Sequence, residues 1–181
     1  MDWMKKVAVA LVCLLPLSLQ AAKVDTLQVK SPSMNKSIEV VVVSPDVAAT
    51  KACPVIYLLH GYGGNARTWV GIKPDLSKIA DEKGIFFVCP DGKNTYWDSP
   101  LNTDVRYETF ISNELVKYVD SRYKTVADRK GRAITGLSMG GHGAMWNGLL
   151  HSDVFSAAGS TSGGVDIRPF PKNWEMSAQI G

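Results

Sequence analysis

Runs and alternations of hydrophobic residues divide the chain after about residue 23 into predicted strands and helices. Residues 24–29 and 38–43 have the composition of two strands with a turn between them. Residues 55–59 form a continuous apolar run, as expected of a strand that is buried on both faces. Further strands are predicted at residues 85–88 and 132–135.

Helical periodicity appears between these strands. Pro74 and Asp75 open a segment that places apolar side chains on one face and that Gly84 ends; the apolar residues are Ile72, Leu76, Ile79 and Ala80. A longer helix is predicted over residues 106–123, with its apolar stripe at Tyr107, Ile111, Leu115, Tyr118 and Val119. A helix rich in small residues follows at 140–150, and 157–159 begins another strand. Two leading strands followed by alternating strand and helix predict an α/β domain with a mostly parallel sheet.

The first 22 residues differ from the rest. Lys5 and Lys6 precede an apolar run over residues 7–19 and a small-residue exit, which is typical of a secretory signal peptide. The alternative, a buried core helix, is weaker because Pro16 interrupts the run, and lipid attachment at Cys13 is disfavoured by the bulky residues before it. We therefore predict a signal peptide at 1–22, a mature domain at 23–181, a secreted or periplasmic location and no stable membrane insertion after removal of the leader.

Size and charge exclude several classes of protein. The 181 residues suffice for one domain with a sizeable core. The net charge is only +3, and the 20 basic residues are spread singly, so the sequence gives no indication of nucleic-acid binding. Three scattered histidines, with no Cys-x-x-Cys pair and no phosphate-binding glycine loop, predict neither a metal nor a cofactor.

The most informative motif lies at residues 136–141, Gly-Leu-Ser-Met-Gly-Gly. It matches G-x-S-x-G, and it lies between a predicted strand and a predicted helix, which is the context of a serine nucleophile in a sharp turn. The same pattern also arises by chance in loops rich in glycine and serine, so the context carries the interpretation. Ser138 is the predicted nucleophile, and the N-terminus of the following helix favours the anionic intermediate.

A second glycine-rich motif, residues 60–64 (His-Gly-Tyr-Gly-Gly), follows the apolar strand at 55–59. Acyl transfer needs two N–H donors for the oxyanion, one from the residue after the nucleophile and one from such a loop. We assign these donors to Met139 and Tyr62. An isolated motif of this kind is an ordinary glycine turn, but the two motifs in this order favour a catalytic site.

Four segments together resemble the esterase D family of α/β-hydrolases, which includes feruloyl esterases, S-formylglutathione hydrolase and the antigen 85 mycolyltransferases; the segments are residues 57–64, 90–92, 107–110 and 136–144. The resemblance covers residues 40–165 and is greatest to secreted carbohydrate esterases. It implies helices on both faces of the sheet, Ser138 as nucleophile, Met139 and Tyr62 as oxyanion donors, and Gly61 and Gly63 as residues that shape the oxyanion loop. It also suggests that Tyr96 and Trp97 contact the acyl or sugar group of a substrate, although aromatic residues in a loop often serve local packing.

The family pattern bears on the two cysteines of the mature chain as well. It makes the strand that begins near Cys53 the parallel neighbour of the strand that ends at Cys89. The two thiols would then be about a strand length, ~17–20 Å, apart, whereas a disulfide requires Cα atoms within ~7 Å. We expect two free, buried thiols.

The partners of the nucleophile are missing from this pattern. In α/β-hydrolases the acid and the histidine follow the serine in that order, yet only His142 and His151 follow Ser138, and both lie on or at the end of the same predicted helix. His60 belongs to the oxyanion loop, where the family resemblance gives it a structural role. We therefore expect a chain truncated before its final strands, which lacks the triad acid and base and full hydrolase activity.

Three functions compete on this basis. The first is a serine carboxylesterase for short acyl, acetyl or feruloyl esters, with a small molecule or a polysaccharide as the alcohol part. The second is an acyltransferase of the same fold. The third is a non-catalytic carbohydrate-binding protein derived from a hydrolase, against which the intact motifs around Ser138 and residues 60–64 argue.

Overall fold

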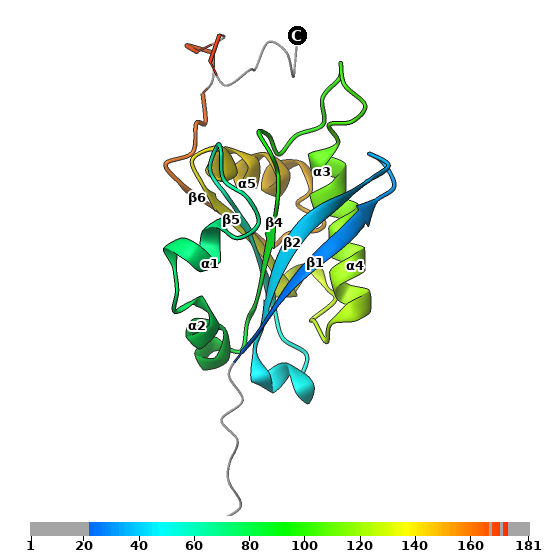
Figure 1. Cartoon of the computed structure of the whole chain (residues 1–181), viewed down its shortest axis with the longest axis vertical. Helices are drawn as coiled ribbons and strands as arrows, with labels where there is room; N and C mark the ends of the chain where they lie inside the picture. The colour runs from blue at the N-terminus through cyan, green and yellow to red at the C-terminus, as the bar shows by residue number, and fades with distance from the viewer. Residues whose placement is uncertain (1–21, 167, 171, 174–181) are drawn as a thin grey trace, which may run out of the picture.

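A six-stranded sheet forms the centre of the computed structural model (Figure 1), which describes residues 22–166, 168–170 and 172–173. The predicted signal peptide lies outside the described residues, apart from Ala22. The strands are β1 (Lys23–Ser31), β2 (Lys36–Ser44), β3 (Val55–Leu59), β4 (Phe86–Pro90), β5 (Arg132–Leu137) and β6 (Ala157–Thr161). Their spatial order is β1-β2-β4-β3-β5-β6.

The direction of the strands changes once across the sheet. β1 and β2 pair antiparallel, and β2 also pairs antiparallel with β4. From β4 onward, through β3 and β5 to β6, every pair is parallel. The carboxyl ends of these four strands therefore lie at one edge of the sheet, which is where ligands bind in open α/β sheets.

Helices cover both faces of the sheet. They are α1 (Thr68–Ile72), α2 (Leu76–Lys83), α3 (Tyr107–Thr109), α4 (Val116–Arg122) and α5 (Met139–Leu150), with a π-helical stretch at Phe110–Leu115 and 3₁₀ turns at Asp46–Ala49 and Arg129–Gly131. Figure 1 shows α1 and α2 on one side of the sheet and α4 on the other. The predicted α/β class, with helices on both faces of a mostly parallel sheet, is confirmed.

Alternation along β2 divides the core between the two faces. Val40 and Val42 pack with residues of the helical segment between 107 and 122 and with Ala144 of α5. Val41 and Val43 point the other way and pack with Leu76 and Ala80 of α2. All four valines are fully buried, as expected of a strand covered on both sides.

Two predicted helices differ from expectation in detail. Ile72 does not share the buried face of α2, because the predicted helix is interrupted at Lys73 and Pro74. Ile72 is instead the last residue of α1 and is 57% exposed. The predicted helix at 106–123 forms, but its middle has wider i→i+5 turns, and Phe110 and Val116 therefore also face the core.

The two cysteines of the described chain are free and buried, as predicted. Cys53 pairs its backbone with Thr125 just before β3, while Cys89 lies within β4. Burial raises the pKa of the Cys89 thiol to about 12, so it is an unreactive core residue. Within the described residues, no helix is both long and apolar enough to cross a membrane.

Candidate active site

Ser138 lies in the sharp turn between β5 and α5. Its backbone has φ 54° and ψ −115°, a conformation that residues other than glycine rarely adopt. The turn is held by two hydrogen bonds: Ser138 N–H donates to the Thr161 carbonyl at 2.8 Å, and the Ser138 carbonyl accepts from His142 N–H at 3.0 Å. Ser138 is exposed at the carboxyl edge of the parallel strands, where a substrate can reach it.

Glycines around Ser138 allow backbone segments to approach closely. A Cβ on Gly140 would overlap the Leu59 carbonyl at the end of β3, and a Cβ on Gly136 would overlap the Gly140 carbonyl. A Cβ on Gly61 would lie 3.6 Å from that of Ser138, so the residue 60–64 loop runs directly beside the nucleophile. The structure thus brings together the two glycine motifs, because they follow β3 and β5, which are paired neighbours in the sheet. Gly61 and Ser138 are 77 residues apart in the sequence.

The two predicted oxyanion donors are the chain neighbours of the residues that approach each other here: Met139 follows Ser138, and Tyr62 follows Gly61. Met139 is the first residue of α5, where a backbone N–H has no partner within the helix and the helix dipole is positive. Across from it, Tyr62 follows Gly61 and is 44% exposed, and Gly63 adopts a left-handed conformation with φ 74° that glycine tolerates at no steric cost. The partial positive charge of the α5 N-terminus therefore lies directly after Ser138.

The buried His60 side chain fixes the loop at residues 60–64 through hydrogen bonds. Its ring is buried; Nε2 accepts the Gly92 N–H at 3.0 Å, and Nδ1 lies 2.7 Å from the Gly61 carbonyl. Because Nε2 accepts, the proton belongs on Nδ1, where it is donated to Gly61. Both ring nitrogens are thus engaged in fixing the oxyanion loop against the segment that follows β4.

A buried carboxylate lies beside His60. Asp91 Oδ1 is 3.4 Å from His60 Nε2 and accepts the Lys93 N–H at 2.8 Å, and Oδ2 is 2.6 Å from Lys93 Nζ. Burial raises the pKa of Asp91, but its neighbours His60 and Lys93 outweigh burial and lower the pKa to about 2. Because His60 Nε2 accepts the Gly92 N–H, the direct donors to the Asp91 carboxylate are the backbone N–H and the ammonium group of Lys93.

The two aromatic residues predicted to contact substrate have different environments. Tyr96 is only 1% exposed; its hydroxyl accepts the His60 N–H at 3.0 Å, and its ring packs against His60. A substrate contact at Tyr96 is therefore not supported, because the side chain satisfies a backbone group in the core. Trp97 is partly buried, and its ring lies 5.3 Å from that of His142 in the first turn of α5.

None of the three histidines is arranged as a base for Ser138. The His142 ring packs between Trp97 and Trp146, and burial lowers its pKa. His151 follows the C-terminal end of α5, ~20 Å along the helix from Ser138, and lies 2.9 Å from Glu108. His60 has both ring nitrogens engaged, as described above.

Sequence reasoning missed three residues that support the site. Thr161 accepts the Ser138 N–H, Asp91 lies beneath His60, and Glu108 joins the helical segment after 107 to α5 by accepting from Trp146 and contacting His151. Pro90-Asp91-Gly92 and the segment around Glu108 both belong to the motifs that carried the family resemblance. The signal was therefore present, but pairwise contacts between distant segments cannot be read from single motifs.

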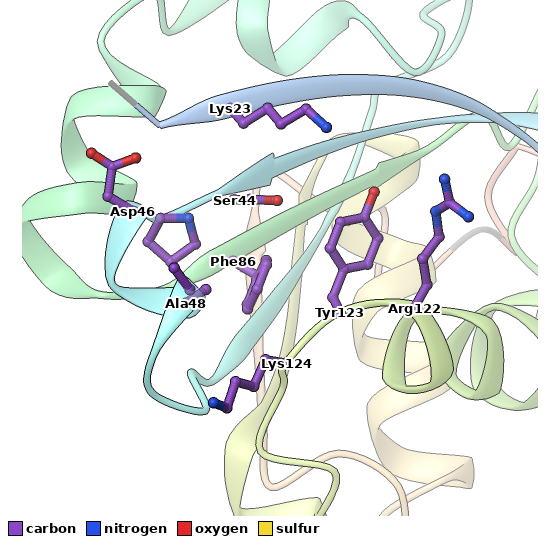
Figure 2. A pocket seen from close by; sticks show the side chains of 10 residues that line it. Lys23, Ser44, Asp46, Ala48, Phe86, Arg122, Tyr123 and Lys124 are labelled. Atoms are coloured by element: carbon purple, nitrogen blue, oxygen red, sulfur yellow. The ribbon is translucent and has the colours of Figure 1, made fainter. Parts of the chain in front are cut away.

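A pocket lies at the end of the sheet opposite to Ser138 (Figure 2). Its lining includes Ser44 at the end of β2, Phe86 at the start of β4, and Tyr123. Since β4 runs from Phe86 toward the edge that carries Ser138, this pocket is not part of the candidate site. Among the described residues, no cluster of three or more His, Cys, Asp or Glu side chains has the geometry of a metal site.

Taken together, the strained strand-to-helix turn at Ser138 and the glycine loop beside it have the arrangement of the α/β-hydrolase class. A family model described as "Putative esterase" matches residues 31–179. The chain therefore belongs to this esterase family, for which the relatives support carboxylic ester hydrolysis at the level of the family.

Individual relatives agree with this assignment. An esterase of Mycobacterium tuberculosis is 32% identical over 149 residues, covering 78% of this chain and 32% of that protein. A diacylglycerol acyltransferase/mycolyltransferase of Mycobacterium leprae is 32% identical over 158 residues, covering 79% and 44%. The solved structure of a ferulic acid esterase matches with a TM-score of 0.75 and 30% identity, covering 89% of this chain and 68% of that one. The chain thus spans about a third of the mycobacterial esterase and about two thirds of the ferulic acid esterase structure.

Proposed function

We propose that this chain carries the nucleophile and the oxyanion hole of a secreted serine carboxylesterase. The observation that supports this most directly is the strained, exposed Ser138 at the start of α5, with the Gly61 backbone beside it. Such strain persists only where the surrounding structure holds it, and it clusters at functional sites. Export depends on residues 1–22, whose pattern is that of a signal peptide before a single domain at 23–181.

In this proposal Ser138 Oγ attacks the carbonyl carbon of an ester. The hydroxyl proton passes to a base, and the resulting oxyanion accepts hydrogen bonds from the backbone N–H groups of Met139 and Tyr62. Collapse of the tetrahedral intermediate expels the alcohol and leaves an acyl group on Ser138, which water then releases as the acid. Gly61 and Gly63 give the loop the shape that this step requires.

The base is not among the three histidines of the chain. His60 and His151 are engaged with other groups, and His142 packs between two indoles. We propose that the base that activates Ser138 is none of these three histidines. The described residues would then position a substrate carbonyl without a histidine that accepts the serine proton.

The substrate is proposed to be a short acyl, acetyl or feruloyl ester whose alcohol part is a small molecule or a carbohydrate. The ferulic acid esterase relative supports this class. Trp97 is the aromatic residue placed to contact the substrate, since its ring borders the first turn of α5. Tyr96 has no part in this proposal, because it is buried.

Hydrolysis of p-nitrophenyl acetate tests the assignment of roles. Loss of the serine or the histidine of a complete triad lowers kcat on the order of 10⁶-fold, so the chain is expected to be slower than a complete serine esterase by a factor of this order. Ser138→Ala is expected to remove what rate remains above the buffer, whereas Ser160→Ala, at an exposed serine of β6, leaves it unchanged. Turnover at an ordinary esterase rate would show that a base is present after all.

Transfer of the acyl group to an acceptor other than water is the second candidate, favoured by the mycolyltransferase relative. Hydrolysis and transfer share the acyl-enzyme at Ser138 and differ only in the acceptor. The two are separated by product analysis with an added alcohol: an acyltransferase gives the new ester as its main product, and a hydrolase gives the free acid.

A further inference from the structure

A polar pocket of about 370 Å³ opens beside the oxyanion loop, within the ~300–1,000 Å³ range of small-molecule sites. We call it the Glu39 pocket. Its floor is the start of β2 and the facing part of β1, with Glu39 and Gln28 as a cross-strand pair. Asn65 and Arg67, just after the oxyanion loop, form one wall, while Asp91 and Lys93, just after β4, form the other.

The second wall is fixed rather than a loose surface loop. The Asp91 side chain is only 8% exposed and holds Lys93 through both its backbone N–H and its ammonium group. Lys93 has φ 52°, a left-handed conformation that is uncommon outside glycine. Strained residues that the surroundings hold in place are concentrated at ligand sites.

The charges of the Glu39 pocket cancel. Arg67 Nε lies 3.9 Å from Glu39 Oε1, and Lys93 is paired with Asp91, so two cations face two anions. The amides of Gln28 and Asn65, the Ser37 hydroxyl and one apolar residue, Ile38, complete the lining. The lining side chains therefore offer many hydrogen-bond donors and acceptors but no net charge that would attract an ion. They suit a ligand whose groups both donate and accept hydrogen bonds, as hydroxyl groups do.

The pocket lies at the same end of the sheet as Ser138. Strands are spaced ~4.8 Å apart, and β4, β2 and β1 are two, three and four positions from β5. The residues that line the pocket therefore begin ~10 Å from the nucleophile across the sheet and extend to ~19 Å from it. A contact chain from Asp91 through His60 to the Gly61 carbonyl joins its wall to the oxyanion loop.

From this placement we propose that the Glu39 pocket binds an uncharged sugar unit in the alcohol part of the ester, remote from the bond that is cleaved. The inference rests on the proposed function, since it assigns the substrate that Ser138 attacks to the carbohydrate esters. Binding energy from such a remote part of a substrate can be used to position the reacting carbonyl.

Titration of the ¹⁵N-labelled protein with xylobiose, followed by NMR, tests this assignment. Saturable shifts are expected at the amides of Asn65, Arg67 and Lys93. Arg67→Ala is expected to raise the Kd at least tenfold, and Glu39→Gln to raise it less, because the amide keeps an acceptor. Lys78→Ala on α2, where Lys78 forms an exposed ion pair with Glu82 and does not line the pocket, is the matched control and is expected to leave the Kd unchanged.

Three results would overturn the inference: no saturable shift at these amides, an equal Kd in Arg67→Ala, or displacement of xylobiose by sodium acetate at equal concentration. The Ser138→Ala variant distinguishes an error in the pocket assignment from an error in the proposed esterase function. Ser138→Ala is expected to bind xylobiose normally, so sugar binding without a reactive serine contradicts the esterase proposal alone. A reactive Ser138 without sugar binding contradicts only the pocket.

Discussion

At the scale of single residues, the site depends on polar groups that are satisfied below the surface. Tyr96 is the clearest case, because its hydroxyl accepts the backbone N–H of His60 in a fully buried position. A buried N–H left without a partner costs ~1–3 kcal/mol. The orientation of the oxyanion loop therefore depends on a residue that cannot touch the substrate.

Replacement of Tyr96 tests this role. Tyr96→Phe removes the acceptor and is expected to lower the free energy of unfolding by ~1–3 kcal/mol in urea denaturation. Tyr107→Phe is the matched control: the Tyr107 hydroxyl is buried and has no hydrogen-bond partner among the described residues, so its loss is expected to be neutral or stabilising. Equal destabilisation by the two variants would contradict the account.

Asp91 gives the protein a specific dependence on pH. Its folded-state pKa of about 2 lies below the unfolded value near 4. The carboxylate therefore contributes stability, roughly 2 kcal/mol, that is present above about pH 4 and is lost as the pH falls through about 2. The Asp91→Asn variant has no carboxylate to protonate at this position. Its unfolding free energy is therefore expected to fall less between pH 6 and pH 2 than that of the unmodified chain, by roughly 2 kcal/mol.

The control for this pH dependence is Asp153→Asn at an exposed position, which is expected to leave the loss of stability in place. Unfolding curves of the three proteins at several pH values provide the comparison. An Asp91→Asn protein that destabilises with acid as steeply as the unmodified chain would show that this carboxylate is not held in its charged form.

At the scale of elements, the turn between β5 and α5 is possible only because the start of α5 touches the end of β3. Gly140 is the contact residue: a side chain there would overlap the Leu59 carbonyl, which is backbone and cannot rotate away. Overpacking of this kind costs ~1–3 kcal/mol or more.

A pair of glycine variants measures that contact. Gly140→Ala is expected to destabilise the fold by at least ~2 kcal/mol. Gly71→Ala, in α1, meets no atom within 4 Å and is expected to be neutral or to stabilise by up to ~1 kcal/mol, since alanine favours the helix. Thermal unfolding followed by circular dichroism distinguishes the two, and a mild effect of Gly140→Ala would show that the elements are less closely packed.

Elements and motifs of local origin could be predicted from the sequence, whereas contacts between distant segments could not. The turn at Ser138 and the loop at residues 60–64 are marked by glycine spacing next to apolar strands, and both occur where the pattern indicated. The burial of Tyr96 was not predictable, because its partner His60 is 36 residues away and an aromatic residue in a loop suits a surface as well as a core. The wider turns around Phe110 also leave no local signature in a helical pattern.

At the scale of the whole molecule, the described residues would form one side of the proposed reaction centre. The sheet, its two layers of helices and the oxyanion loop place an accessible serine at the edge where parallel strands end. The groups that would accept its proton are not found among the three histidines. In the proposed function, the fold therefore positions the nucleophile and stabilises the oxyanion, whereas activation of the nucleophile is a separate contribution.

Site-resolved labelling by a fluorophosphonate, read by mass spectrometry of the intact and digested protein, tests this central claim most directly. The account predicts an adduct confined to Ser138, absent in Ser138→Ala, and formed far more slowly than in a complete serine esterase, because no base removes the hydroxyl proton. An adduct at another serine would contradict the assignment of the nucleophile. Labelling of Ser138 at the rate of a complete enzyme would contradict the absence of a base.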